Sequence, residues 1–471
     1  AQGSRPQPST MSSGGNAATP AEPADGAPKG QPPKGPLMNG LRTLPELPAL
    51  SVDPAHVAPL SLPLEALTFR PTSSTIITHF KNKDRERKIY CNIELDPHEK
   101  ELLRQLQEEA NAQGLEFLPE ITVMTMRFMS RARGDIAKCI RLMHATQNWR
   151  LEHFKNGPIC CSDVIEDMKH GIVYFGGRDS ALRPAIVVRC CRVPKQWYRD
   201  NDIGRLLRIL IFCMEYMMRY MVLPGKIENN CLIVDLKGLS LAQVSISALQ
   251  EIYGVMSHHY IGRVFKFYIC NLAWPLSTIL GMATSLLTDR QKQKLVMVDK
   301  VKDLQKEFAL HQLEEDLGGT RPIIKEFFPF QMQAGPFEAG CTSGPQADPV
   351  PCVHERITKA GFFGHLWDPS LTKFQNLAVE YVPEAPEYFQ RLGVAIPPDC
   401  LTQGTDVAGG SKNGANGFAG GADAPPCEAS HPVHKHEIEE AAGPDLEDKT
   451  EVKPGGLFSC AACICQEPGK A

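Results

Sequence analysis

The chain has 471 residues, of which 22% are charged and 42% are hydrophobic, so it is long enough for two or three globular domains. Its formal net charge is -4, but residues 404–471 hold eleven acidic residues against five lysines, which leaves about +2 for the rest. Such a weak bias gives no electrostatic argument for nucleic-acid binding. Sixteen cysteines without an apolar N-terminal signal segment indicate reduced thiols in the cytosol.

The first two parts of the chain differ in composition. Residues 1–74 have thirteen prolines in their first 66 positions and predict a disordered leader. Residues 75–160 predict a helical module. Its segment DPHEKELLRQLQEEANAQ starts with an Asp-Pro cap signal and then places Leu102, Leu103 and Leu106 at helical spacing. The later segment GDIAKCIRLMHATQNWR repeats this pattern.

Residues 161–325 alternate strand-like runs with longer helical patterns. The runs AIVVRCC, CLIVDL and FKFYICNL are rich in β-branched or aromatic residues. This alternation predicts an α/β domain, in which helices connect the strands of a sheet. The aromatic-rich residues 326–403 are expected to pack on that domain, and the Gly-rich, acidic residues 404–471 predict a disordered tail.

One helix of this domain is predicted to be surrounded on almost every side. The segment IGRLLRILIFCMEYMMRYMVLPG places its charges on one narrow stripe at about 100° per residue, namely Arg205, Arg208, Glu215 and Arg219. An ordinary core helix is the favoured interpretation. Its methionines, among them Met217 and Met221, would also suit a pocket that adapts to flexible chains.

The segment KFYICNLAWPLSTILGMATSLLTD contains 22 consecutive residues, 267–288, without a charged side chain. A membrane-spanning helix needs about 20 mostly apolar residues, but Asn271, Pro275 and Gly281 interrupt this run. FYICN is strand-like, and Pro275 suits the first turn of a new helix over 276–287. That helix is too short to span a bilayer, so it either fills a core or forms a lid over a lipophilic ligand.

Six motifs follow one another in the order typical of one family. They are MRFMSRARGDIAKCIRLMHATQNWR (126–150), GGRDSALRPAIVV (176–188), VDLKGLS (234–240), RVFKFYICNLAWP (263–275), LLTDRQKQKL (286–295) and LEEDLGGT (313–320). Over about residues 95–325 the chain therefore resembles the CRAL-TRIO lipid-binding domain and its N-terminal helical module, as in phosphatidylinositol-transfer proteins.

The resemblance implies an α/β bowl with a mixed, largely parallel sheet, flanking helices and a mobile gate helix. One lipid would lie in the internal cavity as the only ligand, without a cofactor. The gate helix would present Leu276, Ile279, Leu280, Met282 and Leu286. The residues implied to contact the lipid are Lys294, Tyr260, Asn230, Leu232, Met217, Met221, Phe267 and Asn271.

The headgroup positions of the family are only partly retained. Lys294 matches the lysine that follows the gate in phosphatidylinositol-transferring members, where it would neutralise a phosphate. The family's Tyr-Pro-Glu-Arg turn is Tyr260-Ile261-Gly262-Arg263 here and lacks its Glu. A Ser and a Thr that precede the Asp-Leu-Lys-Gly motif are Asn230 and Leu232. Phosphatidylinositol, another phospholipid, a sterol and an isoprenoid therefore all remain candidate ligands.

Two of these signals have simpler explanations. Lys294 belongs to a basic cluster with Arg290, Lys292 and Lys300, which could solvate a helix end or contact anionic headgroups. Arg127, Arg131 and Arg133 are better explained by structural ion pairs. The segment Gly238-Leu239-Ser240-Leu241-Ala242 nearly matches a hydrolase nucleophile elbow, but it lacks the last glycine, so a strand-to-helix turn is preferred over an enzyme.

The C-terminal tail offers sites for modification. Cys460, Cys463 and Cys465 lie beside apolar residues and are candidates for palmitoylation, although an unmodified tail is an equal alternative. His431, His434 and His436 are interpreted as solvated, and no metal site is predicted.

Taken as a whole, the sequence predicts a non-enzymatic lipid-binding and lipid-transfer protein. It is expected to be a monomer in the cytoplasm, to dock transiently as a peripheral protein on membranes, and not to bind nucleic acid. The alternative is an adaptor, in which the lipid is a sensor input and the tails recruit partners.

Overall fold

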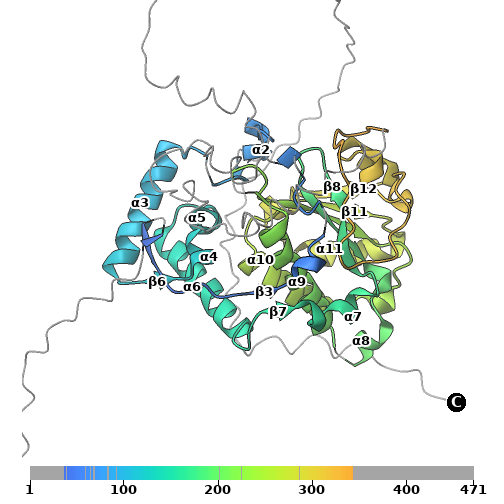
Figure 1. Cartoon of the computed structure of the whole chain (residues 1–471), viewed down its shortest axis with the longest axis horizontal. Coiled ribbons are helices and arrows are strands. Elements are labelled where there is room, and N and C mark those ends of the chain that lie inside the picture. The colour runs from blue at the N-terminus through green and yellow to red at the C-terminus, as the bar shows by residue number, and fades with distance from the viewer. Residues whose placement is uncertain are drawn as a thin grey trace, which may run out of the picture. The chain divides into compact units, whose positions relative to one another are not determined.

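The computed structural model describes residues 37–342, apart from positions 39, 59, 64, 67, 68, 82, 83, 92, 201, 224 and 286. These residues lie within one compact unit (Figure 1). The tail expected at 404–471, with its cysteine and histidine candidates, is outside the described residues, as are 1–36 and 343–403.

A helical module comes first, as the apolar spacing predicts. It contains α3 (Pro97–Ala112), α4 (Pro119–Thr122), α5 (Thr125–Ala132) and α6 (Ile136–His153) (Figure 1). Helix α3 begins at a capping box, in which Asp96 accepts from the Glu99 backbone and Glu99 accepts from that of Asp96. Leu103 and Leu106 of α3 are fully buried in a core shared with α5 and α6.

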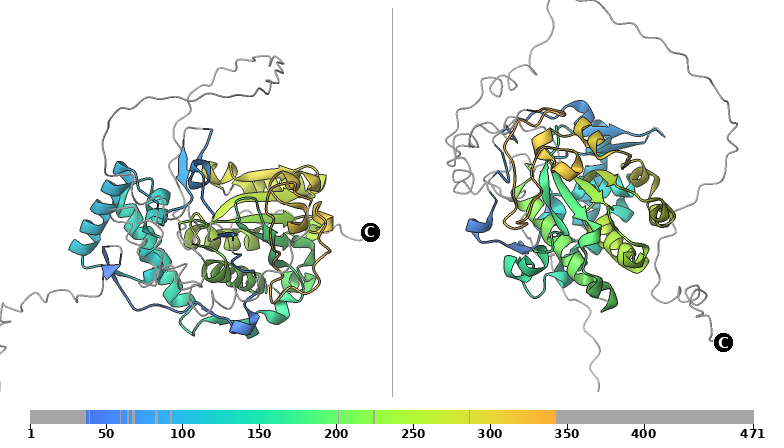
Figure 2. Two further views of the ribbon diagram at one scale, coloured as in Figure 1. Left: turned by 45° about the horizontal axis from the view of Figure 1, so that its top comes forward. Right: turned by 90° about the vertical axis from the view of Figure 1, so that its right-hand side faces the viewer.

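A five-stranded sheet follows, with the strand order β12-β11-β10-β9-β8. Its strands are β8 (Val173–Arg178), β9 (Pro184–Arg189), β10 (Asn230–Asp235), β11 (Val264–Cys270) and β12 (Leu295–Val298). All neighbouring pairs are parallel except β8 and β9, which are antiparallel. The predicted mixed, largely parallel sheet is confirmed, and its strands are twisted (Figure 2).

Helix α7 (Ile165–Met168) precedes the sheet, and the other helices of this domain fill the connections between parallel strands. They are α8 (Lys195–Arg199), α9 (Gly204–Tyr220), α10 (Ile246–His259), α11 (Ser277–Ser285) and α12 (Asp289–Lys292). Helix α9 is buried on most sides, as its sequence predicts. Its Glu215 is also buried, because Arg150 of α6 forms an ion pair with it at 2.8 Å.

The two faces of the sheet have different neighbours. On one face, Phe175 of β8 contacts the ring of Tyr216 of α9. On the opposite face, Lys266 of β11 forms an ion pair with Glu307 at 2.6 Å, and Tyr268 contacts the ring of Phe308. Helices therefore cover the first face, and the 3-10 helices of residues 301–317 cover the second.

The expectation of a disordered leader over 1–74 is wrong for the described residues 37–74. These residues form β1 (Leu37–Met38), β2 (Leu41–Thr43), β3 (Leu50–Ser51) and α2 (Ser73–Ile76). Leu41 and Ala58 are fully buried, and the Ala58 backbone N–H donates to the Tyr216 hydroxyl at 2.8 Å. Proline density here accompanies extended chain that packs on the cores, because proline suits extended segments without helical hydrogen bonds.

Short strands complete the N-terminal half. Strand β4 (Ile77–His79) and β5 (Arg85–Arg87) form an antiparallel hairpin, where the sequence predicts only helices. Strand β6 (Glu116–Phe117) pairs with β2, and β7 (Ile159–Cys160) pairs with β3. At the other end, Phe330 packs its ring against Phe175 and Phe212, so the described part of the aromatic-rich segment lies on the domain core.

Candidate functional site

One face of the sheet carries apolar side chains that are only partly buried. In the register of the parallel strands, Leu232 of β10 lies beside Phe267 of β11, and Phe267 lies beside Leu295 of β12. All three are half-buried, whereas Cys231 and Ile233, which alternate with Leu232, are buried on the opposite face. This apolar face is therefore less densely covered than the rest of the sheet.

Helix α10 contributes to the same region. Its apolar residues Ile252, Val255 and Met256 pack, like Leu232, against the main core, and they too remain half-buried. Only Ala248 is buried in this helix. Half-buried apolar side chains on a helix and on the adjoining sheet leave apolar area accessible, and apolar side chains predominate in the lining of ligand sites.

Asn230 lies at the start of this apolar face. It is the first residue of β10, it is 0% exposed, and strand alternation places its side chain on the same face as Leu232. Neither its Oδ1 nor its Nδ2 atom has a hydrogen-bond partner among the described residues. Because an unsatisfied buried amide is costly, this side chain is a candidate to contact a bound molecule.

The helix predicted over 276–287 is present as α11, Ser277–Ser285. Leu276, directly before it, is buried, and Leu280 is half-buried. Trp274 precedes the helix and is 87% exposed. Leu286 and the side chains of Ile279 and Met282 are outside the described part of the structure.

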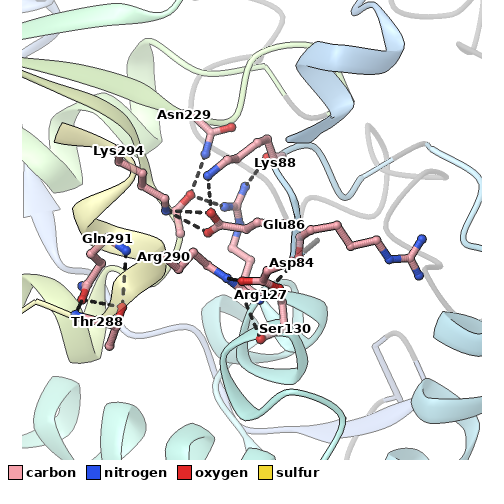
Figure 3. Close-up of polar contacts among 12 residues, drawn as sticks. Asp84, Glu86, Lys88, Arg127, Ser130, Asn229, Thr288, Arg290, Gln291 and Lys294 are labelled. Atoms are coloured by element: carbon pink, nitrogen blue, oxygen red, sulfur yellow. Dashed lines mark hydrogen bonds and ion pairs between the residues drawn. The ribbon is translucent and has the colours of Figure 1, made fainter. Parts of the chain in front are cut away.

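Lys294 lies directly before β12 and is almost fully buried. Its Nζ donates to Glu86 Oε1 at 2.9 Å and lies 2.8 Å from Glu86 Oε2 (Figure 3). Lys88 also donates to Oε2 of the same carboxylate. Burial pushes the pKa of Glu86 upward, but the two ammonium groups outweigh this effect and hold it below its usual range. The ammonium of Lys294 thus already has a carboxylate partner.

The β4–β5 hairpin holds the segment that follows α11 at three places. Besides the contact between Glu86 and Lys294, Arg290 donates to both carboxylate oxygens of Asp84 at 2.7 Å (Figure 3). The backbone N–H of Lys81 donates to Gln293 at 3.0 Å. The segment 290–294, which follows α11, is therefore fixed to the N-terminal part of the chain.

The helical module and the sheet are also joined by buried ion pairs. Arg127 of α5 donates to Glu228 at 2.7 Å, and both side chains are buried, so the structural interpretation of Arg127 is confirmed. Arg150 of α6 pairs with Glu215 of α9.

The sheet and its flanking helices occupy the region in which a family model matches. The model described as the CRAL/TRIO domain matches residues 168–319.

Residues 168–319 are a CRAL/TRIO domain. The resemblance seen in the six motifs is confirmed. Curated relatives of this chain align with it over a longer segment than the family model does. A SEC14 cytosolic factor of Kluyveromyces lactis is 23% identical over 252 residues, which cover 49% of this chain and 80% of that protein. Patellin-6 of Arabidopsis thaliana is 23% identical over 243 residues, covering 48% of this chain and 59% of that protein.

A solved structure, the crystal structure of Sfh5, superposes with a TM-score of 0.41 at 12% sequence identity. It covers 50% of this chain and 91% of the Sfh5 chain.

The remaining predicted ligand residues of the CRAL/TRIO domain already have partners within the protein. Met217 and Met221 are fully buried in the main core. The Tyr260 hydroxyl donates to Glu215 at 2.8 Å, and Asn271 donates to Asp235 at 2.7 Å. The structure therefore brings Leu232, Phe267 and Asn230 together on the apolar face and places these four elsewhere.

The nucleophile-elbow candidate is a strand-to-helix turn. Ser240 caps a short 3-10 helix, and its hydroxyl donates to Gln243 at 2.9 Å. The rings of His258 and His259 make their contacts with the Gly254 carbonyl and the Thr146 hydroxyl.

Within residues 37–342, no described group of three His, Cys, Asp or Glu side chains is placed to hold a metal ion. No helix in that part is long and apolar enough to cross a bilayer.

A buried acidic group lies beside the pair of Arg150 and Glu215. Glu120 of α4 is buried, neither of its carboxylate oxygens has a hydrogen-bond partner among the described residues, and its Oε1 lies 3.9 Å from Arg150. Burial raises the pKa of Glu120 to about 7. Because the folded pKa exceeds the unfolded one, ionisation of Glu120 destabilises the fold increasingly between about pH 4.5 and pH 7.

Glu120→Gln is therefore expected to stabilise the protein at pH 8 by about 1–3 kcal/mol and to have little effect at pH 5. Glutamine imitates the protonated carboxyl, which is the form that the folded protein prefers. Urea unfolding at both pH values measures the difference. Glu251→Gln, at an exposed position of α10, is the control and should change neither curve. An equal effect of Glu120→Gln at both pH values would contradict this assignment.

Glu86 and Lys88 are site residues that the sequence analysis missed. They belong to the charged run KDRERKIY at 83–90, which falls in the segment predicted to be a helical module. The available signal was the strand-like TIIT before the run and the alternation of charge within it. Nothing local indicates that this run contacts a lysine more than 200 positions later.

Proposed function

We propose that the protein binds one lipid on the apolar face of its CRAL/TRIO domain and transfers or presents it at membranes without catalysing a reaction. The observation that supports this proposal is the set of half-buried apolar residues on β10, β11, β12 and α10. A lipid chain inserted there would remove apolar area from water, at about 25 cal/mol per Å². The lipid is the proposed ligand, and no cofactor is required.

Helix α11 is the proposed gate. It connects β11 to α12, and α12 is held to α10 by the bond from the Tyr253 hydroxyl to Gln291 at 3.0 Å. Hinge motion would then occur between Trp274 and Thr288, because the chain after Thr288 is fixed by Asp84 and Glu86. Opening exposes apolar residues such as Leu276, which is favourable only where a bilayer accepts them.

The test of this function starts from the purified full-length protein. Native mass spectrometry should detect one bound lipid per chain, and the protein should accelerate movement of a labelled lipid between vesicles. A protein that carries no lipid and leaves the rate at its spontaneous value would exclude the proposed function. Lipid binding without transfer would limit the role to presentation.

Membrane docking is proposed at the carboxyl edge of the parallel strands. Exposed apolar side chains gather after or near the ends of β10, β11 and β12, namely Leu241, Ile246, Trp274 and Met297. The carboxyl ends of parallel strands meet at the same edge of a sheet. Trp274 is the most exposed of them, and tryptophan favours the membrane interface.

Trp274→Ala is expected to weaken binding to phosphatidylcholine vesicles by about tenfold, because burying most of an indole is worth about 1–2 kcal/mol more than burying a methyl group. Co-sedimentation with vesicles provides the measurement. Leu151→Ala removes an exposed apolar side chain from α6 instead and should leave binding unchanged. Equal losses in the two variants would argue against this docking edge.

A further inference from the structure

The counter-ion of Lys294 is supplied by the protein itself. Lys294 is 7% exposed and Glu86 is 5% exposed, and the two Nζ–Oε distances are 2.8 and 2.9 Å. Glu86 comes from the β4–β5 hairpin, which lies outside the CRAL/TRIO domain. A phosphate that approached Lys294 would therefore meet a carboxylate already in the position that the phosphate would need.

The surrounding contacts hold Glu86 in this position. Its second lysine, Lys88, is 1% exposed, and its hairpin is fixed nearby by the two bonds from Arg290 to Asp84. Burial lowers the pKa of Lys88 well below its usual range, and the positive charge of Lys294 lowers it further. The cluster is thus built to reduce the positive charge around Lys294 rather than to concentrate it for an anion.

The polar group at the start of the apolar face is uncharged. Asn230 offers one donor group and one acceptor atom, and neither has a partner among the described residues. Lys294 lies at the amino end of β12, whose first residue pairs with Phe267 of the same apolar face. A hydroxyl group both donates and accepts, so an uncharged hydroxyl-bearing head satisfies an amide of this kind, whereas an ionised phosphate offers acceptors only.

We propose that Glu86 determines lipid specificity: it takes the place of a lipid phosphate at Lys294, so the site selects a lipid with an uncharged, hydroxyl-bearing head over an anionic phospholipid. This inference rests on the proposed lipid-binding function. It assigns to a residue outside the CRAL/TRIO domain the choice between two classes of lipid.

The test compares diacylglycerol with phosphatidic acid of the same acyl chains, because these two lipids differ only in the phosphate. The full-length protein is incubated with phosphatidylcholine vesicles that contain one or the other, and the lipid taken up is quantified by mass spectrometry. The wild-type protein should prefer diacylglycerol. Glu86→Gln should raise the uptake of phosphatidic acid relative to diacylglycerol by at least about tenfold, since a like charge beside the phosphate is removed.

Glu101→Gln is the matched control, because it makes the same substitution in a carboxylate of α3 that pairs with Arg104 on the surface rather than with Lys294. It should leave the selectivity unchanged. The double variant Glu86→Gln with Lys294→Met should lose the gain in phosphatidic acid uptake, since the unpaired ammonium is gone. If Glu86→Gln does not fold, the double variant Glu86→Met with Lys294→Met replaces the buried pair by apolar side chains and should keep diacylglycerol uptake.

The outcomes are distinct. A wild-type protein that takes up neither these lipids nor any native lipid would exclude the proposed function and this inference with it. Lipid uptake whose selectivity is the same in the wild type and Glu86→Gln would overturn the role of Glu86 alone. Loss of all lipid uptake in the double methionine variant would likewise overturn it, because Lys294 would then be required for the ligand.

Discussion

Arg189→Met is expected to lower the free energy of unfolding by about 3–5 kcal/mol. Arg189 ends β9, is 2% exposed and donates to three carboxylates: Asp235 at 2.7 Å, Asp316 at 2.8 Å and Glu314 at 3.0 Å. Methionine fills a similar volume without a charge. The variant would leave Asp235 and Glu314 buried without their cation, which is the main cost.

Chemical unfolding at neutral pH, followed by circular dichroism, measures this loss. Arg189→Lys should give an intermediate value, because lysine keeps the charge but cannot reach all three carboxylates with a planar fork. Arg199→Met, at an exposed position of α8, is the control and should stay within about 0.5 kcal/mol of the wild type. A loss of less than about 1 kcal/mol in Arg189→Met would show that the acidic turn at 314–316 is not held by this arginine.

Gly281→Asp and Leu280→Asp are expected to reduce lipid transfer between vesicles by about 100-fold while leaving the fold intact. Both place a carboxylate in α11, and a charge that must enter the apolar part of a bilayer costs about 2.5–3.5 kcal/mol. Gly281 is exposed and no atom lies within 4 Å of the position of its missing Cβ, so the aspartate fits in the closed state. The loss would therefore arise when the gate opens.

Gly281→Ala is the matched control, since it fills the same space without a charge. It should retain transfer and increase stability slightly, because alanine favours a helix over glycine by about 0.8–1.0 kcal/mol. The measurement is the rate of movement of a labelled lipid, together with thermal unfolding of each variant. Undiminished transfer by Gly281→Asp would exclude contact of this face of α11 with the membrane interior.

The sequence predicted the elements whose cause is local. The Asp-Pro cap signal before α3, the apolar spacing of α3 and α6, and the β-branched runs of β9 to β11 each specify a structure within a few residues. Pro275 also correctly predicted a boundary between a strand and a helix, because it lies between β11 and α11. The packing of residues 37–74 was not predicted, because short extended segments acquire their structure from the cores that they cover.

The site was predicted in part, and for a physical reason. The family resemblance implied Leu232 and Phe267, and the structure places them side by side on one face of the sheet. The carboxylate beside Lys294 could not be predicted, since Glu86 precedes it by 208 positions and belongs to a hairpin without a strong pattern. Asn271 was expected to face the ligand, but its bond to Asp235 depends on a positive φ of 55°, which the sequence does not reveal.

The buried ion pairs between the two halves have a consequence for how the protein can be divided. An expressed fragment limited to residues 168–319 would retain Lys294, Glu228 and Glu215 but lose Glu86, Arg127 and Arg150. Removing the N-terminal part would break these three buried pairs and expose to water the apolar surface that it covers, and a typical domain is stable by only about 5–15 kcal/mol. The smallest autonomous folding unit therefore starts before residue 77, well upstream of the family boundary.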